Sequence, residues 1–361
     1  MRPSPAEVAS ALFLAGVSLA ACTIQVTLGS GLGAGGGDGD GGTVASSGGT
    51  GSSTASTAGS GGGGIGGAAS GTATLIFAVG NSGLNPWGIA VDAANVYFTD
   101  AQGPNGRVMK VPLDGSPASA LATMEDLPSA IAVDATDVYF IAANALRRVP
   151  IAGGPAASLA PANDAGYASI AIDAANVYWT NYASAGSTML LPKAGGTPTV
   201  VDSGDEYPSG IALAGGSVYW AAMEAGAIKS APIAGGAVTV VASGQSYPRS
   251  GLATDGAYVY WVTEGDLPNH LFKAPLAGGP AVDVAAASSD TITPQSLVVD
   301  ATHAYFLDTD IAACGLVKVE LASGAVSTIP LGGSVGCPMF LAADAANVYC
   351  TTNLGIARIV K

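Results

Sequence analysis

The residues that could carry out acid–base or metal chemistry are few and widely spaced. The chain has only two histidines, His270 and His303. A zinc site needs three or four His, Cys, Asp or Glu ligands at one point, and a Ser-His-Asp triad needs a histidine placed between a serine and an aspartate. A single histidine beside a carboxylate, such as His270 near Glu264 or Asp266, is the most that the sequence offers for general acid–base catalysis. The sequence therefore leans towards a protein without catalytic activity, and a solvated loop is the simpler interpretation of His270.

Five aspartates share one local setting, because each follows a short apolar stretch and opens a turn. A short carboxylate at such a place accepts hydrogen bonds from backbone amides two residues on and stabilises the turn. In one further segment the equivalent turn is Ala214-Gly215-Gly216, which needs no carboxylate. We therefore predict a structural role for these five residues, which are Asp92, Asp134, Asp173, Asp300 and Asp344.

These turns belong to a repeat that must position every other side chain. Each unit has an apolar first strand, a tight turn, a second strand around Val-Tyr, a third strand and a short fourth strand. Repeats of about 40–45 residues with this pattern indicate propeller blades. The sequence predicts an all-β, seven-bladed β-propeller of four-stranded blades over residues 73–361. The marker of each unit is a tyrosine, at Tyr97, Tyr139, Tyr178, Tyr219, Tyr260, Tyr305 and Tyr349.

The seventh unit reaches Lys361 at the end of its third strand and has no fourth strand after it. The segment ATLIFAV at Ala73–Val79 precedes the first unit and has the apolar, β-branched character of a strand. We predict that this segment completes the last blade. The ring would then have no open seam between its first and last blades.

Two segments carry a resemblance to known repeats: PWGIAVDAANVYFTD at 86–100 and VYWTNYASAG at 177–186. They resemble NHL-type and YWTD-type propeller repeats, and the resemblance covers residues 73–361. The YWTD family usually has six blades, so seven units favour the NHL-like count. Propellers of these kinds include binding scaffolds, signalling ectodomains and enzymes, so the resemblance implies a fold and leaves the function open.

In such a propeller, the loops that enter each first strand share a face with the loops between second and third strands. Aromatic rings at this concave mouth could stack on sugars or hold peptide side chains, and Arg249 could bind a carboxylate or phosphate. The same rings could instead plug the channel or rest on neighbouring blades. The predicted ligand-binding set is Trp87, Tyr167, Tyr207, Tyr247, Arg249 and Gln295, with Ser129 and Met339 at the corresponding places of two other blades.

The mouth loops offer few residues for catalysis. His270 and His303 fall in loops that project from opposite faces, so they cannot share one site. Asp308 and Asp310 with nearby carbonyls could hold calcium, and otherwise we predict no cofactor and no metal. The alternative to a binding protein is a cation-dependent hydrolase or lyase, resembling lactonases or streptogramin lyases. Its carboxylates would come from Asp100, Glu224, Glu264, Asp266, Asp308 and Asp310.

The first 22 residues predict export. The apolar run Val8–Ala21 is too short to span a bilayer and has the length of a signal-peptide core. It ends in Leu19-Ala20-Ala21-Cys22, which resembles the bacterial lipobox, whose cysteine is acylated. We expect Cys22 to carry a lipid, with plain secretion as the alternative. By resemblance to proteobacterial lipoproteins, the non-acidic Thr23 favours the outer membrane of the cell envelope.

Residues 23–72 form a linker rich in Gly, Ser and Thr, with almost nothing to bury, so we expect it to be disordered. Its Gly/Ser part would reach roughly 35–40 Å as a flexible coil. The net charge of −14 argues against nucleic acid as a partner. We expect a monomer that reaches the membrane through its lipid and binds a protein, peptide or glycan at the loop face. A purely structural surface protein is a further reading.

Cysteine usage fits an exported protein. Cys314 and Cys337 fall in loops on one face of adjacent blades, so a disulfide between them is geometrically plausible. It would contribute about 3 kcal/mol in the chain-entropy model. Cys350 is the rival partner for Cys337. Five bases on third strands, by contrast, are spread around the ring and predict a solvated blade face: Lys110, Arg148, Lys273, Lys318 and Arg358.

Overall fold

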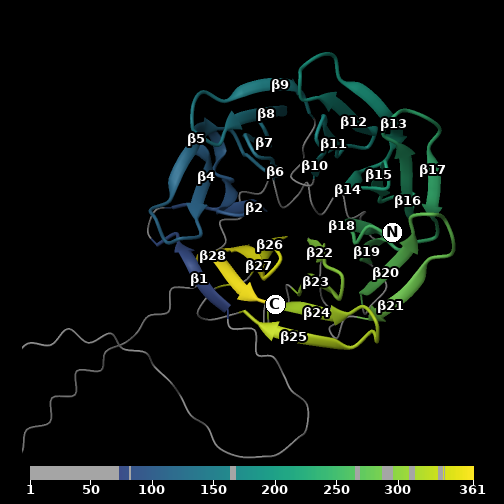
Figure 1. The fold of residues 1–361 in the computed structure, drawn as a ribbon. Coiled ribbons are helices and arrows are strands. Elements are labelled where there is room, and N and C mark those ends of the chain that lie inside the picture. Colours follow the sequence, from purple (N-terminus) through teal and green to yellow (C-terminus); the bar gives the residue numbers. More distant parts are fainter. Residues whose placement is uncertain are drawn as a thin grey trace, which may run out of the picture. The chain divides into compact units, whose positions relative to one another are not determined.

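The computed structural model describes residues 73–80, 83–162, 168–264, 269–286, 296–308, 314–331, 336 and 338–361. These residues form seven four-stranded antiparallel sheets in a ring, so the predicted seven-bladed β-propeller is confirmed (Figure 1). In the described residues the only helix is the short 3-10 helix η1 (Gly103–Asn105), and no helix there is long and apolar enough to cross a membrane. The predicted signal peptide, Cys22 and the linker lie outside the described residues.

The blades are numbered 1 to 7 in the chain order of their innermost strands, which surround the central channel (Figure 1). The innermost strands are β2 (Pro86–Val91), β6 (Ile131–Val133), β10 (Ile170–Ile172), β14 (Pro208–Ala214), β18 (Pro248–Thr254), β22 (Leu297–Val299) and β26 (Pro338–Ala343). The second strands are β3 (Asn95–Asp100), β7 (Asp137–Ala142), β11 (Asn176–Asn181), β15 (Ser217–Ala222), β19 (Tyr258–Thr263), β23 (His303–Asp308) and β27 (Asn347–Thr352).

The third and fourth strands form the outer half of each blade. The third strands are β4 (Gly106–Pro112), β8 (Ala145–Pro150), β12 (Gly186–Pro192), β16 (Ala227–Pro232), β20 (His270–Pro275), β24 (Gly315–Glu320) and β28 (Gly355–Val360). The outermost strands are β5 (Ser119–Glu125), β9 (Ala157–Pro161), β13 (Thr199–Asp205), β17 (Thr239–Ala242), β21 (Val282–Ala286), β25 (Val326–Pro330) and, in blade 7, β1 (Ala73–Ala78).

Strand β1 closes the ring, as the sequence predicted. It pairs antiparallel with β28, with Ala73 opposite Ile359 and Leu75 opposite Ala357. The ring of Phe77 lies 5.5 Å from the ring of Phe98 in blade 1, so β1 also packs across the junction between the first and last blades. The two ends of the propeller are therefore held together by backbone pairing and by apolar contacts.

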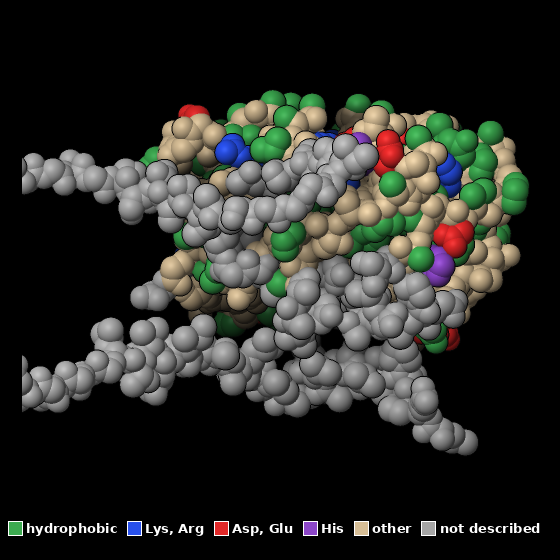
Figure 2. Space-filling model, turned by 90° about the horizontal axis from the view of Figure 1, so that it is seen from below, with side chains coloured by type: hydrophobic (Ala, Val, Ile, Leu, Met, Phe, Trp, Pro, Cys, Tyr) green, Lys and Arg blue, Asp and Glu red, His purple; other side chains and the backbone are tan. Residues whose placement is uncertain are grey.

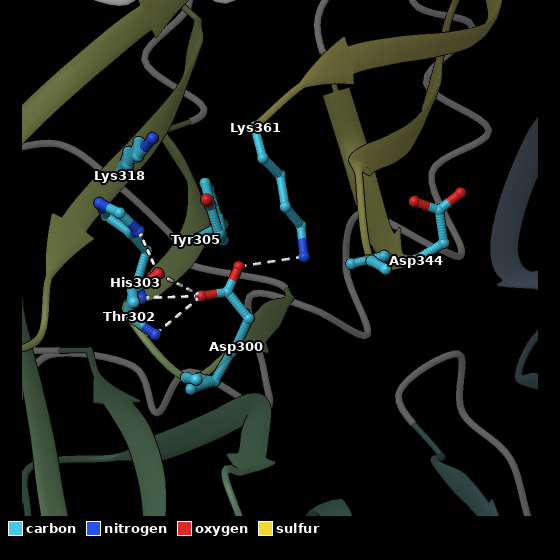
Figure 3. Close-up of a pocket in the computed structure, with 11 residues that line it drawn as sticks. Asp300, Thr302, His303, Tyr305, Lys318, Asp344 and Lys361 are labelled. Atoms are coloured by element: carbon cyan, nitrogen blue, oxygen red, sulfur yellow. Dashed lines mark hydrogen bonds and ion pairs between the residues drawn. The ribbon is translucent and has the colours of Figure 1, made fainter.

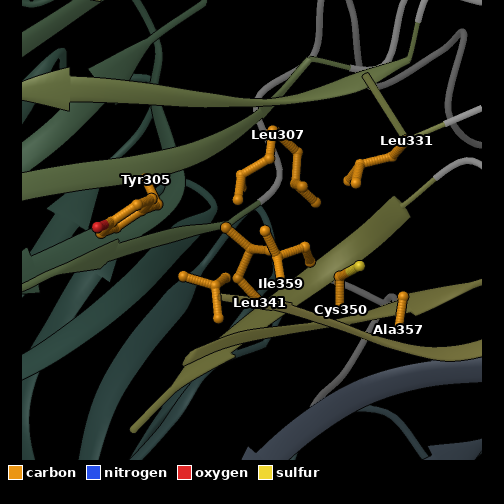
Figure 4. Close-up of a cluster of buried hydrophobic side chains, with 9 residues drawn as sticks. Tyr305, Leu307, Leu331, Leu341, Cys350, Ala357 and Ile359 are labelled. Carbon is orange, nitrogen blue, oxygen red and sulfur yellow. The ribbon is translucent and has the colours of Figure 1, made fainter. Parts of the chain in front are cut away.

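The hydrophobic core lies between adjacent blades. Second strands such as β3 bury successive residues, because neighbouring blades cover both of their faces: Val96, Tyr97 and Phe98 are all fully buried. In blade 7 the place of Phe98 is taken by Cys350, which is buried and free. Leucines and Ile359 pack around its smaller side chain (Figure 4).

The aspartate turns have the predicted structural role. In blade 1, Oδ1 of Asp92 accepts the backbone amides of Ala94 and Asn95, both at 2.7 Å. The hydroxyl of Tyr97 donates to Oδ2 of the same carboxylate at 2.8 Å. The structure adds Asp255 in blade 5 to this set, with the same pattern of contacts.

The third-strand bases predicted to share one position do so, since each lies opposite the marker tyrosine of its blade. The cross-strand pairs are Tyr97 with Lys110, Tyr139 with Arg148, Tyr260 with Lys273, Tyr305 with Lys318, and Tyr349 with Arg358. Among the described residues on the side of the ring seen in Figure 2, the basic side chains are scattered.

Candidate functional site

The candidate site is the face where loops enter the innermost strands, which we call the mouth face. At three of these loops a bulky residue precedes the proline that begins the next blade. Leu127, Tyr207 and Tyr247 occupy this position, and their φ angles are 46°, 55° and 42°. A positive φ is rare for side chains of this kind and destabilises the folded backbone by about 1–3 kcal/mol. Leu127 is 44% exposed and Tyr247 37% exposed, so little burial offsets this strain.

Each of these strained loops is fixed by the residue two positions earlier. Asp205 accepts the indole N–H of Trp220 at 2.9 Å and forms an ion pair with Lys229, both in blade 4. Gln245 accepts the indole N–H of Trp261 in blade 5 at 2.9 Å. The mouth therefore presents Tyr207 and Tyr247 from loops that are tied to the following blade.

The loop that carries Leu127 is tied in a related way. Glu125, two positions earlier, lies 3.1 Å from Nε of Arg147 in blade 2, and its side chain is almost fully buried. Sequence reasoning missed Leu127, although its Leu-Pro step corresponds to the Tyr-Pro steps at 207 and 247. The Xaa-Pro step before each innermost strand is the signal that could have identified it.

Tyr207 is half-buried because it rests on a second tyrosine. Its ring lies 5.0 Å from that of Tyr182, which comes from the loop between the second and third strands of blade 3. The Tyr182 hydroxyl in turn contacts Sδ of Met223 at 4.0 Å in blade 4. Loops of two blades thus meet at the mouth, as expected for the two loop types that share this face.

Arg249 lies at the mouth but is already paired within the protein. Its Nη1 is 2.5 Å from Oε2 of Glu264, and its side chain is only 13% exposed. A ligand carboxylate would therefore have to compete with Glu264 for this guanidinium. The geometry does not favour the predicted role of Arg249 as a clamp for a ligand anion.

Trp87 lines the central channel rather than the outer rim. Its ring lies 5.2 Å from Phe340 of blade 7. The channel cavity has a volume of about 140 Å³ and is bordered mainly by apolar residues of the innermost strands. This volume is smaller than the 300–1,000 Å³ typical of small-molecule sites. Of the other predicted site residues, Tyr167 and Gln295 lie outside the described residues.

Carboxylates near the mouth do not converge in the described part of the chain. Asp100 is fully buried, and its Oδ1 accepts the backbone amide of Asn85 at 2.8 Å. Burial raises the pKa of Asp100, although Asn85 and Arg107 act in the opposite direction. Glu224 is exposed, while Asp266, Asp310 and the side chain of Asp308 are not described. No group of three or more His, Cys, Asp or Glu among the described residues could hold a metal ion.

Each histidine contacts a residue of its own blade. Nδ1 of His270 lies 2.8 Å from Oδ2 of Asp283 on β21, rather than beside Glu264, which pairs with Arg249. Nδ1 of His303 lies 2.8 Å from the hydroxyl of Thr302 in the turn before β23. They stand on different strands of different blades, so they form no joint site.

The structure describes two of the four cysteines, Cys314 and Cys350. Cys314 is disulfide-bonded, and Cys350 is a free thiol that lies fully buried in the core. Burial raises the pKa of the Cys350 thiol to about 12, so this thiol stays protonated and unreactive. Cys337, the predicted partner of Cys314, lies outside the described residues, and this pairing stays a prediction.

Comparison with known proteins defines the class. No family model and no curated protein matches the sequence. Among solved structures, a virginiamycin B lyase from Staphylococcus aureus superposes with a TM-score of 0.67 and 15% identity over 80% of this chain and 99% of that one. A streptogramin B lyase gives 0.64 and 15%, over 80% of this chain and 97% of that one. A chain of a nidogen/laminin complex gives 0.50 and 16%, over 65% and 93%.

These likenesses show the fold alone, because all of the identities are low. The chain is a β-propeller protein whose mouth carries three strained, bulky side chains. Neither the lyase activity nor the complex named for those structures follows from the likeness.

Proposed function

We propose that this protein is an envelope-tethered lipoprotein whose propeller acts as a non-enzymatic binding module for a protein, peptide or glycan. The observation that carries the proposal is the display of Leu127, Tyr207 and Tyr247 in left-handed backbone at one mouth. Backbone strain of this kind persists where the surroundings enforce it, and it is concentrated at binding and catalytic sites. Exposed aromatic and aliphatic side chains on fixed loops provide contact area with little loss of conformational entropy on binding.

The rim, rather than the channel, is the proposed contact surface. The channel cavity is small, and Trp87 and Phe340 border it. A macromolecular partner can cover the rim without entering the channel. Tyrosine at such a rim can stack on a sugar ring and also donate a hydrogen bond through its hydroxyl.

The test uses purified peptidoglycan sacculi as a defined envelope glycan and peptide probe, with co-sedimentation of the domain at 73–361. Tyr207→Gly combined with Tyr247→Gly removes both rings at positions where glycine suits the positive φ. Val240→Ser is the matched control, since Val240 is 54% exposed on the outermost strand β17. We expect the double variant to lose at least tenfold in affinity and the control to bind as the parent does.

Binding that is equal in all three proteins would exclude the tyrosines as the contact, and absence of any binding would exclude this glycan as the partner. The tether is tested separately by mass spectrometry of the mature N-terminus. A diacyl or triacyl group on Cys22, lost together with membrane association in Cys22→Ala, is the expected result.

The second candidate is a cation-dependent lyase or hydrolase, and it is favoured by the shared fold of the lyase structures. It is separated from the binding module by incubating the domain with virginiamycin B and a divalent cation and following the compound by liquid chromatography with tandem mass spectrometry. Hydrolysis would add the mass of one water, whereas an elimination that opens a ring would leave the mass unchanged and alter the retention time and the fragments. Either conversion at enzymatic rates would establish the enzyme and refute the binding module as the sole function.

A further inference from the structure

A pocket of about 590 Å³ opens between blades 6 and 7 on the face opposite the mouth (Figure 3). This face carries the turns between first and second strands. The polar and ionisable side chains that border the pocket are Asp300, Thr302, His303, Tyr305, Lys318, Asp344 and Lys361. The remaining border is small and largely apolar, with Val299, Ala301, Ala343 and Ala345 among its residues.

Both aspartates of the pocket are satisfied by the protein itself. Oδ2 of Asp300 lies 3.0 Å from Nζ of Lys361, and Oδ1 accepts hydrogen bonds from the backbone amides of Thr302 and His303. Asp344 accepts two amides of its own turn at 2.7 Å and the hydroxyl of Tyr349 at 2.8 Å. Figure 3 shows its carboxylate turned away from Lys361. Asp300 is thus neutralised by Lys361, whereas Asp344 is bonded only by neutral groups of its own blade and keeps its charge.

Lys318 is the second lysine that borders the pocket, besides the paired Lys361. Its Nζ lies 5.7 Å from the centre of the Tyr305 ring, and it forms no ion pair with any described residue. Lys361 lies at the same distance from that ring. Glu320, two residues further along β24, is engaged by the hydroxyl of Ser323. Lys318 therefore borders the pocket without an ion-pair partner among the described residues, next to an apolar wall.

Blades 2 and 3 contain the same framework and serve as an internal comparison. There a pocket of about 570 Å³ is bordered by Asp134 and by Lys193, which pair at 2.7 Å as Asp300 and Lys361 do. The strand position of Lys318 is filled by Arg148, and that of His303 is filled by Asp137. Nε of Arg148 lies 3.9 Å from Asp137. A carboxylate thus neutralises the base in blade 2, and a histidine replaces that carboxylate in blade 6.

The hydrogen bonds of His303 leave its Nε2 free to contact a bound anion. The hydroxyl of Thr302 donates to Oδ1 of Asp300 at 2.9 Å, so its contact of 2.8 Å with Nδ1 of His303 makes Nδ1–H the donor. Nδ1 is then fixed, and Nε2 is left for a ligand. Figure 3 shows His303 and Lys318 on the same side of Tyr305.

We propose that the pocket between blades 6 and 7 binds the carboxylate or phosphate group of a small organic anion. Lys318 supplies the main charge, His303 donates through Nε2 when protonated, and Lys361 lies at the rim. The apolar wall accepts the carbon skeleton of the ligand. This site lies on the other face from the proposed partner surface and does not depend on it.

The test measures binding of inorganic phosphate and of benzoate to the domain at 73–361 by isothermal titration calorimetry at low ionic strength. Lys318→Gln removes the charge, and His303→Asp restores the arrangement of blade 2. Lys273→Gln is the matched control, because Lys273 has the same strand position in blade 5 and does not border the pocket. We expect millimolar binding of at least one anion, a fivefold or greater loss in the first two variants, and no change in the control.

Unchanged melting temperatures establish that the variants are folded. The proposal is overturned if neither anion binds, if His303→Asp binds as tightly as the parent, or if Lys273→Gln loses as much affinity as Lys318→Gln.

Discussion

Nζ of Lys193 in blade 3 lies 2.7 Å from Oδ2 of Asp134 in blade 2, the oxygen that accepts a tyrosine hydroxyl in four other blades. Those four pairs are Tyr97 with Asp92, Tyr178 with Asp173, Tyr260 with Asp255, and Tyr349 with Asp344. Lys361 repeats the lysine arrangement at Asp300. One carboxylate oxygen thus either closes a turn within its blade or ties that turn to the next blade.

Lys193→Met should destabilise the domain by about 1 kcal/mol, because a partly buried ion pair between blades is lost while the turn amides keep their acceptor. Asp134→Ala should have the larger effect, about 2 kcal/mol, since it also leaves the turn amides without their carboxylate. Urea unfolding of the two single variants and the double variant measures both changes. Equal effects of the two single variants would contradict the interpretation that Lys193 contributes only the ion pair, whereas Asp134 contributes the ion pair and also stabilises its own turn.

Protonation of the turn carboxylates should weaken the fold in acid. Burial acts to raise the pKa of Asp92, but the amides of Ala94 and Asn95 and the Tyr97 hydroxyl outweigh it, so the pKa lies below its ordinary value. A lowered pKa contributes stability that is present above about pH 4 and is lost as the pH falls through the folded-state value. Asp92→Asn should therefore cost about 1 kcal/mol at pH 7 and much less at pH 2. A difference that does not depend on pH would refute this explanation.

The pH dependence of stability that arises from Asp100 should have the opposite sign to that of Asp92. Its pKa is raised chiefly by burial, so its contribution to stability is present below about pH 4 and is lost as the pH rises through the folded-state value. Its Oδ2 is buried without a hydrogen-bond partner among the described residues. We expect Asp100→Asn to stabilise the domain by about 1 kcal/mol at pH 7 and to have no effect at pH 3. Thermal unfolding at the two pH values measures this, and destabilisation at pH 7 would show that the charge itself is needed.

Removal of β1 should open the ring. A chain that starts at residue 80 lacks the outermost strand of blade 7 and exposes the edge of β28, together with the side of Phe98 that Phe77 covers. We expect a loss of at least about 3 kcal/mol or aggregation through the free edge. A chain that starts at residue 73 is the control and should unfold at the temperature of the full-length domain. Differential scanning calorimetry decides between the two outcomes.

Relief of strain at the mouth should separate function from stability. Tyr247→Gly places glycine at a φ of 42° and removes a side chain that is 37% exposed. Stability should stay the same or rise by up to about 1 kcal/mol, in contrast to the usual cost of removing a tyrosine from a packed site. A loss of more than about 2 kcal/mol would show that Tyr247 is a packing residue rather than part of a contact surface.

The sequence by itself determined the number of blades, the order of their strands and the closure of the ring. These features rest on short-range patterns: the recurring tyrosine, the turn after each innermost strand, and an apolar segment at Ala73–Ala78 with no unit of its own. The role of Asp92 and its equivalents was also predictable, because the groups that donate hydrogen bonds to Asp92 lie within five residues of it.

Only the tertiary structure decided which charges are neutralised and which side chains are strained. Arg249 meets Glu264 across two strands, and Lys193 meets Asp134 across two blades, so neither pairing has a local signature. Lys318 and Arg148 share a repeat position, yet of the two only Arg148 has an ion-pair partner among the described residues. The energy of a charge depends on what folding places within a few ångströms of it, and a repeat pattern along the chain does not contain that information.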